Sequence, residues 1–200
     1  MLIAIEGIDG AGKTSVARAL VRKLRERGLE AIYTREPLAT PFINGLERFS
    51  SIAREAPELA AFAMCADRVV HVKRVIEPML RRGIVVVTDR YFYSTIAYQG
   101  AMGLEIDWLR ELCRVFPKPD LAIYLRISVD EALRRIGARG CGRLSSLFEK
   151  RSFLERVSRI FDELANSGEL VVVDASKPLE KVVSECLSLT LSTARKPRLP

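Results

Sequence analysis

Short apolar runs alternate with amphipathic segments along the whole 200-residue chain. Continuous apolar runs predict strands that are buried on both faces of a sheet, whereas apolar residues that recur every three to four positions predict helices. The predicted strands lie at residues 2–5, 31–33, 84–87, 120–125 and 169–173. Because predicted helices separate them, we expect an α/β fold with a five-stranded parallel sheet and helices on both faces.

The longest of the predicted helices covers residues 57–82. It begins at Pro57, and its apolar residues cover most of its circumference. Such a helix is either buried within the domain or shared between two subunits. Asp67, Arg68 and His71 are polar exceptions on this helix. Such residues usually pair with a neighbour or face solvent, and Arg68 is the candidate to reach into a pocket as a ligand contact.

A glycine-rich segment follows the first apolar run directly. Its pattern, Gly7-x-x-x-x-Gly12-Lys13-Thr14, is that of a phosphate-binding loop between a strand and a helix. Glycines let several backbone N–H groups face one point, the helix N-terminus adds partial positive charge, and Lys13 adds a full charge. Thr14 is placed to bind Mg²⁺. The residues expected to hold a nucleoside triphosphate are Gly7, Ile8, Asp9, Gly10, Ala11, Gly12, Lys13, Thr14 and Ser15.

Polar residues also follow other predicted strands, at the sheet edge where α/β proteins bind ligands. These residues are Arg35 and Glu36 after the second strand, Asp89 and Arg90 after the third, and Ser176 and Lys177 after the fifth. Asp89 is the candidate to share Mg²⁺ with Thr14. An Arg-Glu pair suits a phosphate site, although such a pair taken alone is more often a solvated turn.

A short helix after Asp89 carries Ser94, Tyr98 and Gln99. Small polar, aromatic and amide side chains of this kind can read the edge of a base or a sugar. The alternative is an ordinary amphipathic turn, which explains the same residues without a ligand.

Residues 137–146 combine three glycines and two arginines with little apolar content, so they cannot pack into a core, and a mobile lid is expected over about 137–149. Arginines on a closing lid can neutralise charge on a transferred phosphoryl group and exclude water. The candidates are Arg134, Arg135, Arg139 and Arg143. The alternative is a basic surface loop.

The net charge of +7 is compatible with nucleic acid, acidic lipid or small phosphorylated ligands, so the placement of the cations must decide. We expect no nucleic-acid partner, since the basic tail at 195–200 is short, and no membrane partner, since no apolar run approaches the roughly 18 residues of a span. The four cysteines lack C-x-x-C spacing, which favours reduced thiols over zinc or disulfides. The expectation is one cytoplasmic domain over residues 1–194 and a disordered tail.

The excess of arginines around the expected site bears on the type of reaction. A hydroxyl acceptor needs a carboxylate to take its proton, whereas a phosphate acceptor is already ionised near pH 7. The residues therefore favour a nucleoside monophosphate kinase, followed by a small-molecule kinase, and then by a nucleotide-driven switch or nucleic-acid motor.

Across nearly its whole length the chain resembles the thymidylate kinases. The matching stretches are residues 6–14, 34–37, 66–68, 89–100 and 174–180. The resemblance implies a phosphate-loop NTPase fold with an arginine-bearing lid and transfer of the ATP γ-phosphate to dTMP, giving dTDP and ADP in dTTP biosynthesis. It also implies Mg²⁺ as cofactor and a homodimer, for which we expect contacts through the 57–82 helix region.

The resemblance assigns roles by position. Asp9 faces the acceptor nucleotide, Arg35 and Arg90 hold its phosphate, and Arg68 recognises thymine. The residues implied on the acceptor side are Asp9, Arg35, Glu36, Met64, Arg68, Arg90, Ser94, Tyr98, Gln99 and Glu149. Those implied near the adenine are Arg135, Ser176 and Lys177. The implied catalytic residues are Lys13, Asp9, Arg90, Arg139 and Arg143.

Three positions depart from the family pattern. Position 10 is glycine rather than arginine, which is similar to the subgroup whose catalytic arginine comes from the lid, hence Arg139 and Arg143. Leu38-Ala39-Thr40 replaces two glycines and a threonine. Met64 stands where a phenylalanine often stacks on thymine, and a thioether can cover a ring face with a different geometry.

Overall fold

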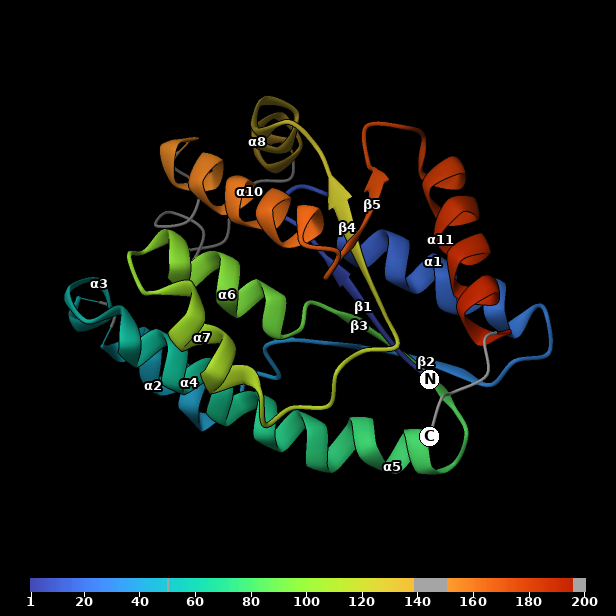
Figure 1. Ribbon diagram of the computed structural model, residues 1–200, viewed down its shortest axis with the longest axis horizontal. Coiled ribbons are helices and arrows are strands. Elements are labelled where there is room, and N and C mark those ends of the chain that lie inside the picture. The colour runs from blue at the N-terminus through green and yellow to red at the C-terminus, as the bar shows by residue number, and fades with distance from the viewer. Residues whose placement is uncertain (50, 139–150, 196–200) are drawn as a thin grey trace.

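A parallel five-stranded sheet forms the centre of the computed structural model, which describes residues 1–49, 51–138 and 151–195 (Figure 1). The strand order is β2-β3-β1-β4-β5. The strands are β1 (Leu2–Glu6), β2 (Ala31–Arg35), β3 (Val85–Asp89), β4 (Leu121–Arg126) and β5 (Val171–Asp174). The predicted fold class and all five strands are confirmed. The expected lid arginines 139 and 143, Glu149 and the tail at 196–200 lie outside the described residues.

Strand pairing determines which polar residues meet. Ile5 of β1 and Arg35 of β2 both pair with Asp89 at the end of β3, so the carboxyl ends of these strands lie together. β2 is longer than the predicted 31–33, because Thr34 and Arg35 continue the ladder beside Thr88 and Asp89. Arg35 is therefore the last residue of a strand rather than the first of a turn.

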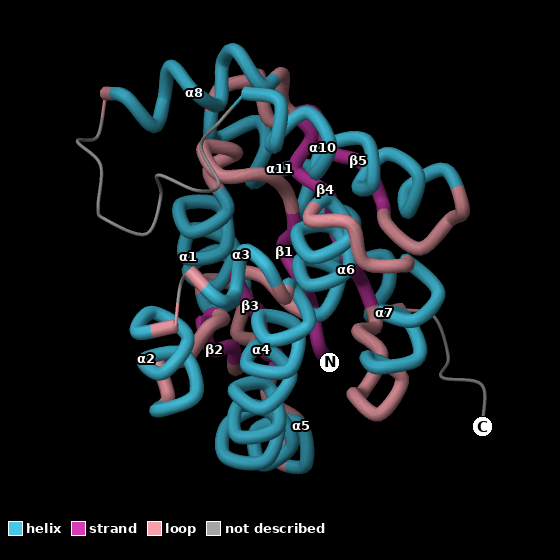
Figure 2. Tube along the Cα trace, turned by 90° about the vertical axis from the view of Figure 1, so that its left-hand side faces the viewer, coloured by secondary structure: helices cyan, strands magenta, loops and turns pink. Residues whose placement is uncertain are grey.

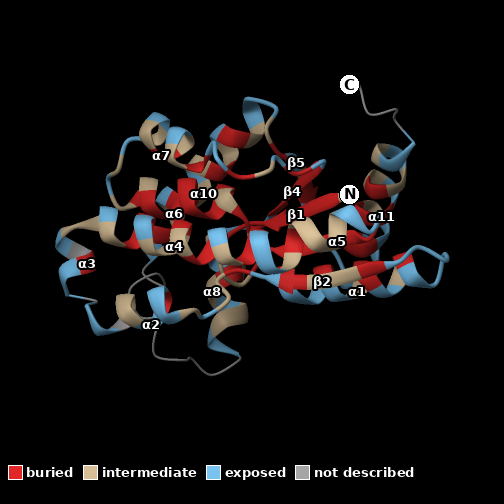
Figure 3. Cartoon of the chain, turned by 90° about the horizontal axis from the view of Figure 1, so that it is seen from below, coloured by how far each residue is buried: buried red, intermediate tan, exposed pale blue. Residues whose placement is uncertain are grey.

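Helices cover both faces of the sheet, as the alternating pattern predicts. They are α1 (Lys13–Arg25), α2 (Pro41–Arg48), α3 (Ile52–Glu55), α4 (Pro57–His71), η1 (Val72–Ile76), α5 (Glu77–Arg81), α6 (Phe92–Ala101), α7 (Ile106–Cys113), α8 (Val129–Gly137), α10 (Arg151–Asn166) and α11 (Leu179–Ala194). Helices α1 and α11 lie on one face, and α4, α6, α7 and α10 lie on the other (Figure 1). Buried residues concentrate along the strands and the inner sides of these helices (Figure 3).

The predicted helix at 57–82 is one continuous rod made of α4, the π-helical turn η1 and α5. Its α5 end and helix α8 lie at opposite ends of the molecule (Figure 2). The rod buries one side against the domain, including Arg68, Val72 and Ile76, but leaves Phe62 and Val69 about half exposed. The apolar circumference thus reflects one buried face and one apolar surface patch.

Three of the four cysteines, Cys65, Cys113 and Cys186, are buried and unbridged, as expected, while Cys141 lies outside the described residues. Within the described ranges, no helix has the length and apolar character that crossing a membrane requires.

Candidate active site

The phosphate loop, residues 7–12, joins the carboxyl end of β1 to the start of α1, where the sequence predicts it. Gly10 has a φ of 86°, and a Cβ atom at this position would collide with the backbone carbonyl of Ala132 in α8. Only glycine combines this conformation with so close an approach. Because α8 packs directly on the loop, an arginine does not fit at position 10.

Lys13 begins α1 and is almost completely buried. Its Nζ donates to the carbonyl oxygen of Ile8 at 2.8 Å and lies 3.8 Å from Oδ1 of Asp9. Burial, together with the positive charge of Arg90, lowers the pKa of Lys13 to about 8. A phosphate bound at the helix N-terminus would favour the charged ammonium, since an opposite charge stabilises it.

Thr14 and Asp89 meet at the start of α1, although 75 residues separate them in the chain. The Thr14 hydroxyl donates to Oδ2 of Asp89. A hydroxyl and a carboxylate are hard oxygen ligands, and Mg²⁺ commonly takes one or two of these from protein and the rest from water and nucleotide phosphates. The pair therefore fits the magnesium position expected from the sequence.

Arg90 leaves the end of β3 with a φ of 72° and points its guanidinium at three side chains and at the carbonyl oxygen of Gly7. It donates to the Asp9 carboxylate, to Oγ of Ser94 at 2.9 Å and to the Tyr98 hydroxyl at 3.0 Å. Burial alone would raise the pKa of Asp9, but the charges of Arg90 and Lys13 outweigh it and lower that pKa to about 2. Asp9 is thus ionised and holds Arg90 between the phosphate loop and α6.

Glu6, the last residue of β1, is a fully buried carboxyl group that the sequence reasoning missed. It accepts hydrogen bonds from the backbone N–H of Tyr91 at 2.8 Å and from the Ser94 hydroxyl at 2.6 Å. Desolvation raises its pKa to about 7. Glu6 therefore acts on Arg90 indirectly: it fixes the Ser94 hydroxyl, which in turn accepts a hydrogen bond from Arg90. A glutamate at the end of an apolar strand was the available signal.

A cavity of about 210 Å³ lies beside Arg90, and it gathers most residues that the resemblance assigns to the acceptor. Its lining consists of Asp9, Glu36, Pro37, Met64, Arg68, Arg90, Tyr91, Ser94, Thr95, Tyr98 and Gln99. Met64 belongs to this lining. We call this space the acceptor cavity. Tyr91 and Thr95 are lining residues that sequence reasoning did not single out.

Arg35 and Glu36, adjacent in the chain, have different surroundings. Arg35 is exposed and lines a second cavity of about 370 Å³ that also contains Lys13, Thr14 and Asp89. Glu36 is buried and binds Arg68 and His71. The two residues therefore do not act as one solvated pair, and the carboxylate is occupied by protein cations.

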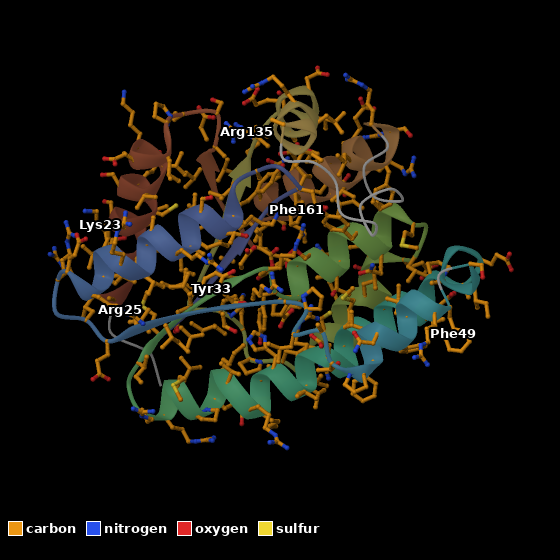
Figure 4. All side chains as sticks on the ribbon, turned by 180° about the vertical axis from the view of Figure 1, so that it is seen from behind. Lys23, Arg25, Tyr33, Phe49, Arg135 and Phe161 are labelled. Carbon is orange, nitrogen blue, oxygen red and sulfur yellow. The ribbon has the colours of Figure 1, made fainter. Side chains whose placement is uncertain are left out.

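Arg135, Ser176 and Lys177 come together around a third cavity, of about 460 Å³. Arg135 extends from α8 toward the segment after β5, where it donates to the carbonyl oxygen of Ala175 at 3.1 Å (Figure 4). Gly12 and Ser15 line both this cavity and the second one. We call this third space the donor cleft. The acceptor cavity, the second cavity at the phosphate loop and the donor cleft are thus neighbours, because each shares lining residues with the next.

Comparison with known proteins agrees with this arrangement. The family model described as Thymidylate kinase matches residues 5–186. The chain belongs to the thymidylate kinase family. It is similar to the "Probable thymidylate kinase" of Archaeoglobus fulgidus, with 43% identity over 92% of each chain, and to that of Staphylothermus marinus, with 40% identity over 94% of each. The "Thymidylate kinase" of Xylella fastidiosa strain 9a5c is 41% identical over 98% of this chain and 92% of the relative.

For a member of the thymidylate kinase family, the described residues bring together both sides of the expected site. The acceptor-side residues surround one cavity or its mouth, and the adenine-side residues surround another. Arg139, Arg143 and Glu149 lie outside the described residues, so the roles expected for them stay predictions. The contact of Glu36 with His71 and the hydrogen bond from Ser94 to Glu6 behind Arg90 are features that only the fold reveals.

Proposed function

We propose that the protein transfers the γ-phosphoryl group of ATP to dTMP, forming dTDP and ADP, and that the residues gathered around the phosphate loop carry out this reaction. The observation that carries the proposal is the acceptor cavity of a thymidylate kinase family member. It adjoins the second cavity, at the phosphate loop, and the two share the lining residues Asp9, Glu36, Pro37 and Arg90. A monophosphate held there would lie next to the donor phosphates.

The proposed donor site uses the loop backbone, Lys13 and the N-terminus of α1 to bind the ATP phosphates. Thr14 and Asp89 would hold Mg²⁺, which offsets phosphate charge when it is bound. The adenine would lie in the donor cleft between Arg135 and the Ser176-Lys177 segment. Because α8 leaves no room for a side chain at position 10, the lid residues Arg139 and Arg143 are the proposed source of the remaining positive charge.

On the acceptor side, Arg90 and Arg35 would bind the dTMP phosphate. Asp9, Ser94 and Tyr98 fix the guanidinium of Arg90 before the substrate arrives, so little ordering remains to be done on binding. The attacking oxygen belongs to a phosphate that is already ionised near neutral pH, so no general base is needed. Arg68, Met64 and Gln99 would then contact the base, and Glu149 would lie near the acceptor.

The first experiment is a panel assay of ADP formation from ATP and Mg²⁺ with dTMP, dUMP, UMP, CMP, AMP, GMP or thymidine as acceptor. We expect dTMP to give the highest kcat/KM, with a modest preference over dUMP, because one methyl group is worth only about 1–3 kcal/mol. A clear preference for thymidine or another monophosphate would contradict the proposed acceptor. Turnover that no acceptor stimulates would favour a nucleotide-driven switch.

We further place the enzyme in the cytoplasm, as is typical of thymidylate kinases, and propose that it is a homodimer through the 57–82 helix region. Phe62 and Val69 support this, since they are exposed apolar residues seven positions apart on α4, and Phe62 packs edge-on against Trp108 at 5.8 Å. Light scattering should give twice the monomer mass for the wild type and the monomer mass for Phe62→Glu. A monomeric wild type would contradict the proposal.

A further inference from the structure

A buried polar network lies behind the acceptor cavity. It consists of Thr34, Glu36, Arg68, His71 and Thr95, and we call it the Arg68 network. Its members come from β2, the segment after β2, α4 and α6. All five side chains are buried, and three of them also line the cavity wall. A network that is both buried and adjacent to the cavity can determine how the cavity presents its hydrogen-bond donors.

Arg68 is only 2% exposed, and two of its three guanidinium nitrogens are occupied by protein. Nε donates to Oε2 of Glu36 at 2.7 Å, and Nη2 donates to Oγ1 of Thr95 at 2.9 Å. Nη1 is buried and has no hydrogen-bond partner among the described residues. Since buried donors are normally paired and Arg68 lines the acceptor cavity, we take Nη1 as the donor that a ligand in this cavity would satisfy.

His71, the single histidine of the chain, is completely buried on the other side of Glu36. Its Nδ1 lies 2.9 Å from Oε1 of Glu36, and its Nε2 lies 2.7 Å from Oγ1 of Thr34. An ionised carboxylate only accepts hydrogen bonds, so Nδ1 is the donor in this contact. The Thr34 hydroxyl is the hydrogen-bond partner of the second ring nitrogen, Nε2. With both ring nitrogens bonded, the plane of the imidazole is fixed.

The two oxygens of Glu36 are thus divided between two residues that lie one turn apart on α4. Oε2 binds Arg68 and Oε1 binds His71. Removal of the His71 contact would leave Oε1 buried without its partner and free the carboxylate to rotate. The carboxylate would then hold the guanidinium less rigidly, so that only Thr95 and the rings of Tyr91 and Phe116 would still fix the direction of Nη1.

We propose that His71, with Thr34, is a positioning residue for base recognition, because it orients Arg68 through Glu36. This inference rests on the proposed function and deepens it. A guanidinium carries donors only, so a fixed Nη1 suits a base that presents a carbonyl oxygen at this point and leaves an exocyclic amino group unpaired. The network should therefore discriminate thymine from cytosine, which differ in this way.

The test compares kcat/KM for dTMP and dCMP in the wild type, His71→Leu and His71→Asn. His71→Leu removes the donor to Glu36 at similar volume, and we expect the dTMP-to-dCMP ratio to fall by about tenfold or more, within the range of one lost buried hydrogen bond. The KM for dTMP should rise, while the KM for ATP and the kcat at saturating dTMP stay within about threefold of wild type. His71→Asn keeps a donor near Nδ1 and should restore most of the ratio.

Thr34→Val removes only the partner of Nε2, and we expect it to lower the ratio by about threefold to fivefold. Thr190→Val is its matched control, because Thr190 is also buried but donates to the carbonyl oxygen of Cys186 on α11, away from the acceptor cavity. The control should leave the ratio unchanged.

A folded His71→Leu enzyme whose ratio stays within about twofold of wild type would overturn the inference. If that variant does not fold, Thr34→Val decides, and an unchanged ratio in Thr34→Val overturns the inference equally. Failure of the proposed function is a different result, since the wild type itself would then show no preference for dTMP.

Discussion

The acceptor side of the phosphate loop contains a buried ion pair, whereas the charged side chains of the donor cleft are partly or largely exposed. Arg68 and Glu36 are both buried and form an ion pair at 2.7 Å. In the donor cleft, Lys177 pairs with Glu185 at 3.2 Å, and both side chains are 42% exposed. The two sides of one active site thus use charge in different ways.

Under the proposed function, the difference follows from what each side would recognise. An acceptor base is read through hydrogen bonds to particular atoms, which requires side chains held in one orientation. Donor phosphates are common to every nucleoside triphosphate, and backbone N–H groups, a helix N-terminus and one lysine bind them. Loss of one partner of a buried pair should therefore have large effects, and loss of an exposed charge should have small ones.

The largest effect is expected where the two sides meet, at Lys13. Lys13→Ala removes the buried cation that would follow the transferred phosphoryl group, and we expect kcat to fall by about a thousandfold or more. The matched control is Lys23→Ala. Lys23 lies in the same helix, its side chain is 42% exposed and pairs with Glu26, and the variant should keep wild-type turnover (Figure 4). Turnover of Lys13→Ala close to wild type would remove the phosphate-loop interpretation.

Substitutions of the lid arginines test whether the described residues around the phosphate loop supply all of the catalytic charge. We expect Arg139→Ala or Arg143→Ala to lower kcat by at least about a hundredfold, because an arginine that stabilises charge in phosphoryl transfer is worth about 10³–10⁵ in rate. Arg159→Ala, an exposed arginine on α10, is the control. A loss under about fivefold in both lid variants would show that the lid supplies no catalytic charge.

Glu6 makes the folding stability of the protein depend on pH. Its pKa rises from an ordinary 4.5 to about 7 in the folded protein, so the native state holds more protons than the unfolded state between these values. Stability from this group is therefore greatest below about pH 4.5 and falls as the pH rises toward 7. The unfolding free energy of Glu6→Gln, relative to wild type, should increase by about 2–3 kcal/mol from pH 5 to pH 8.

The measurement is denaturant unfolding of both proteins across that range. Glu163→Gln changes an exposed glutamate on α10 and should leave the difference within about 0.5 kcal/mol at every pH. A pH-independent difference for Glu6→Gln would mean that the carboxyl group of Glu6 does not titrate in this window.

The smallest effect is expected in the donor cleft. Lys177→Ala removes an exposed cation whose pairing with Glu185 contributes little, so the KM for ATP should change by less than about threefold. Steady-state kinetics at saturating dTMP would measure it. A tenfold rise in that KM would indicate that the donor side also depends on a positioned charge, and the contrast between the two sides would disappear.

Much of the fold followed from local pattern. The five strands, the phosphate loop and most of the helices are encoded in runs of consecutive residues, because burial on both faces of a sheet and turning at glycines are local requirements. The polar residues after the strands were expected to converge, since parallel strands end at one edge. Helices α2 and α3 were not predicted, and they lie in a stretch without a long apolar period.

The sequence by itself determined where the phosphate loop and the strand ends that carry Asp89 and Arg90 lie. Only the tertiary structure decided which partners the polar side chains have there. Glu6 meets Ser94 across 88 positions, and Glu36 binds Arg68 and His71 across 32 and 35. No periodicity encodes such pairs. They form because burial leaves a charged group no water to bind, so each must find its partner wherever the folded chain brings one near.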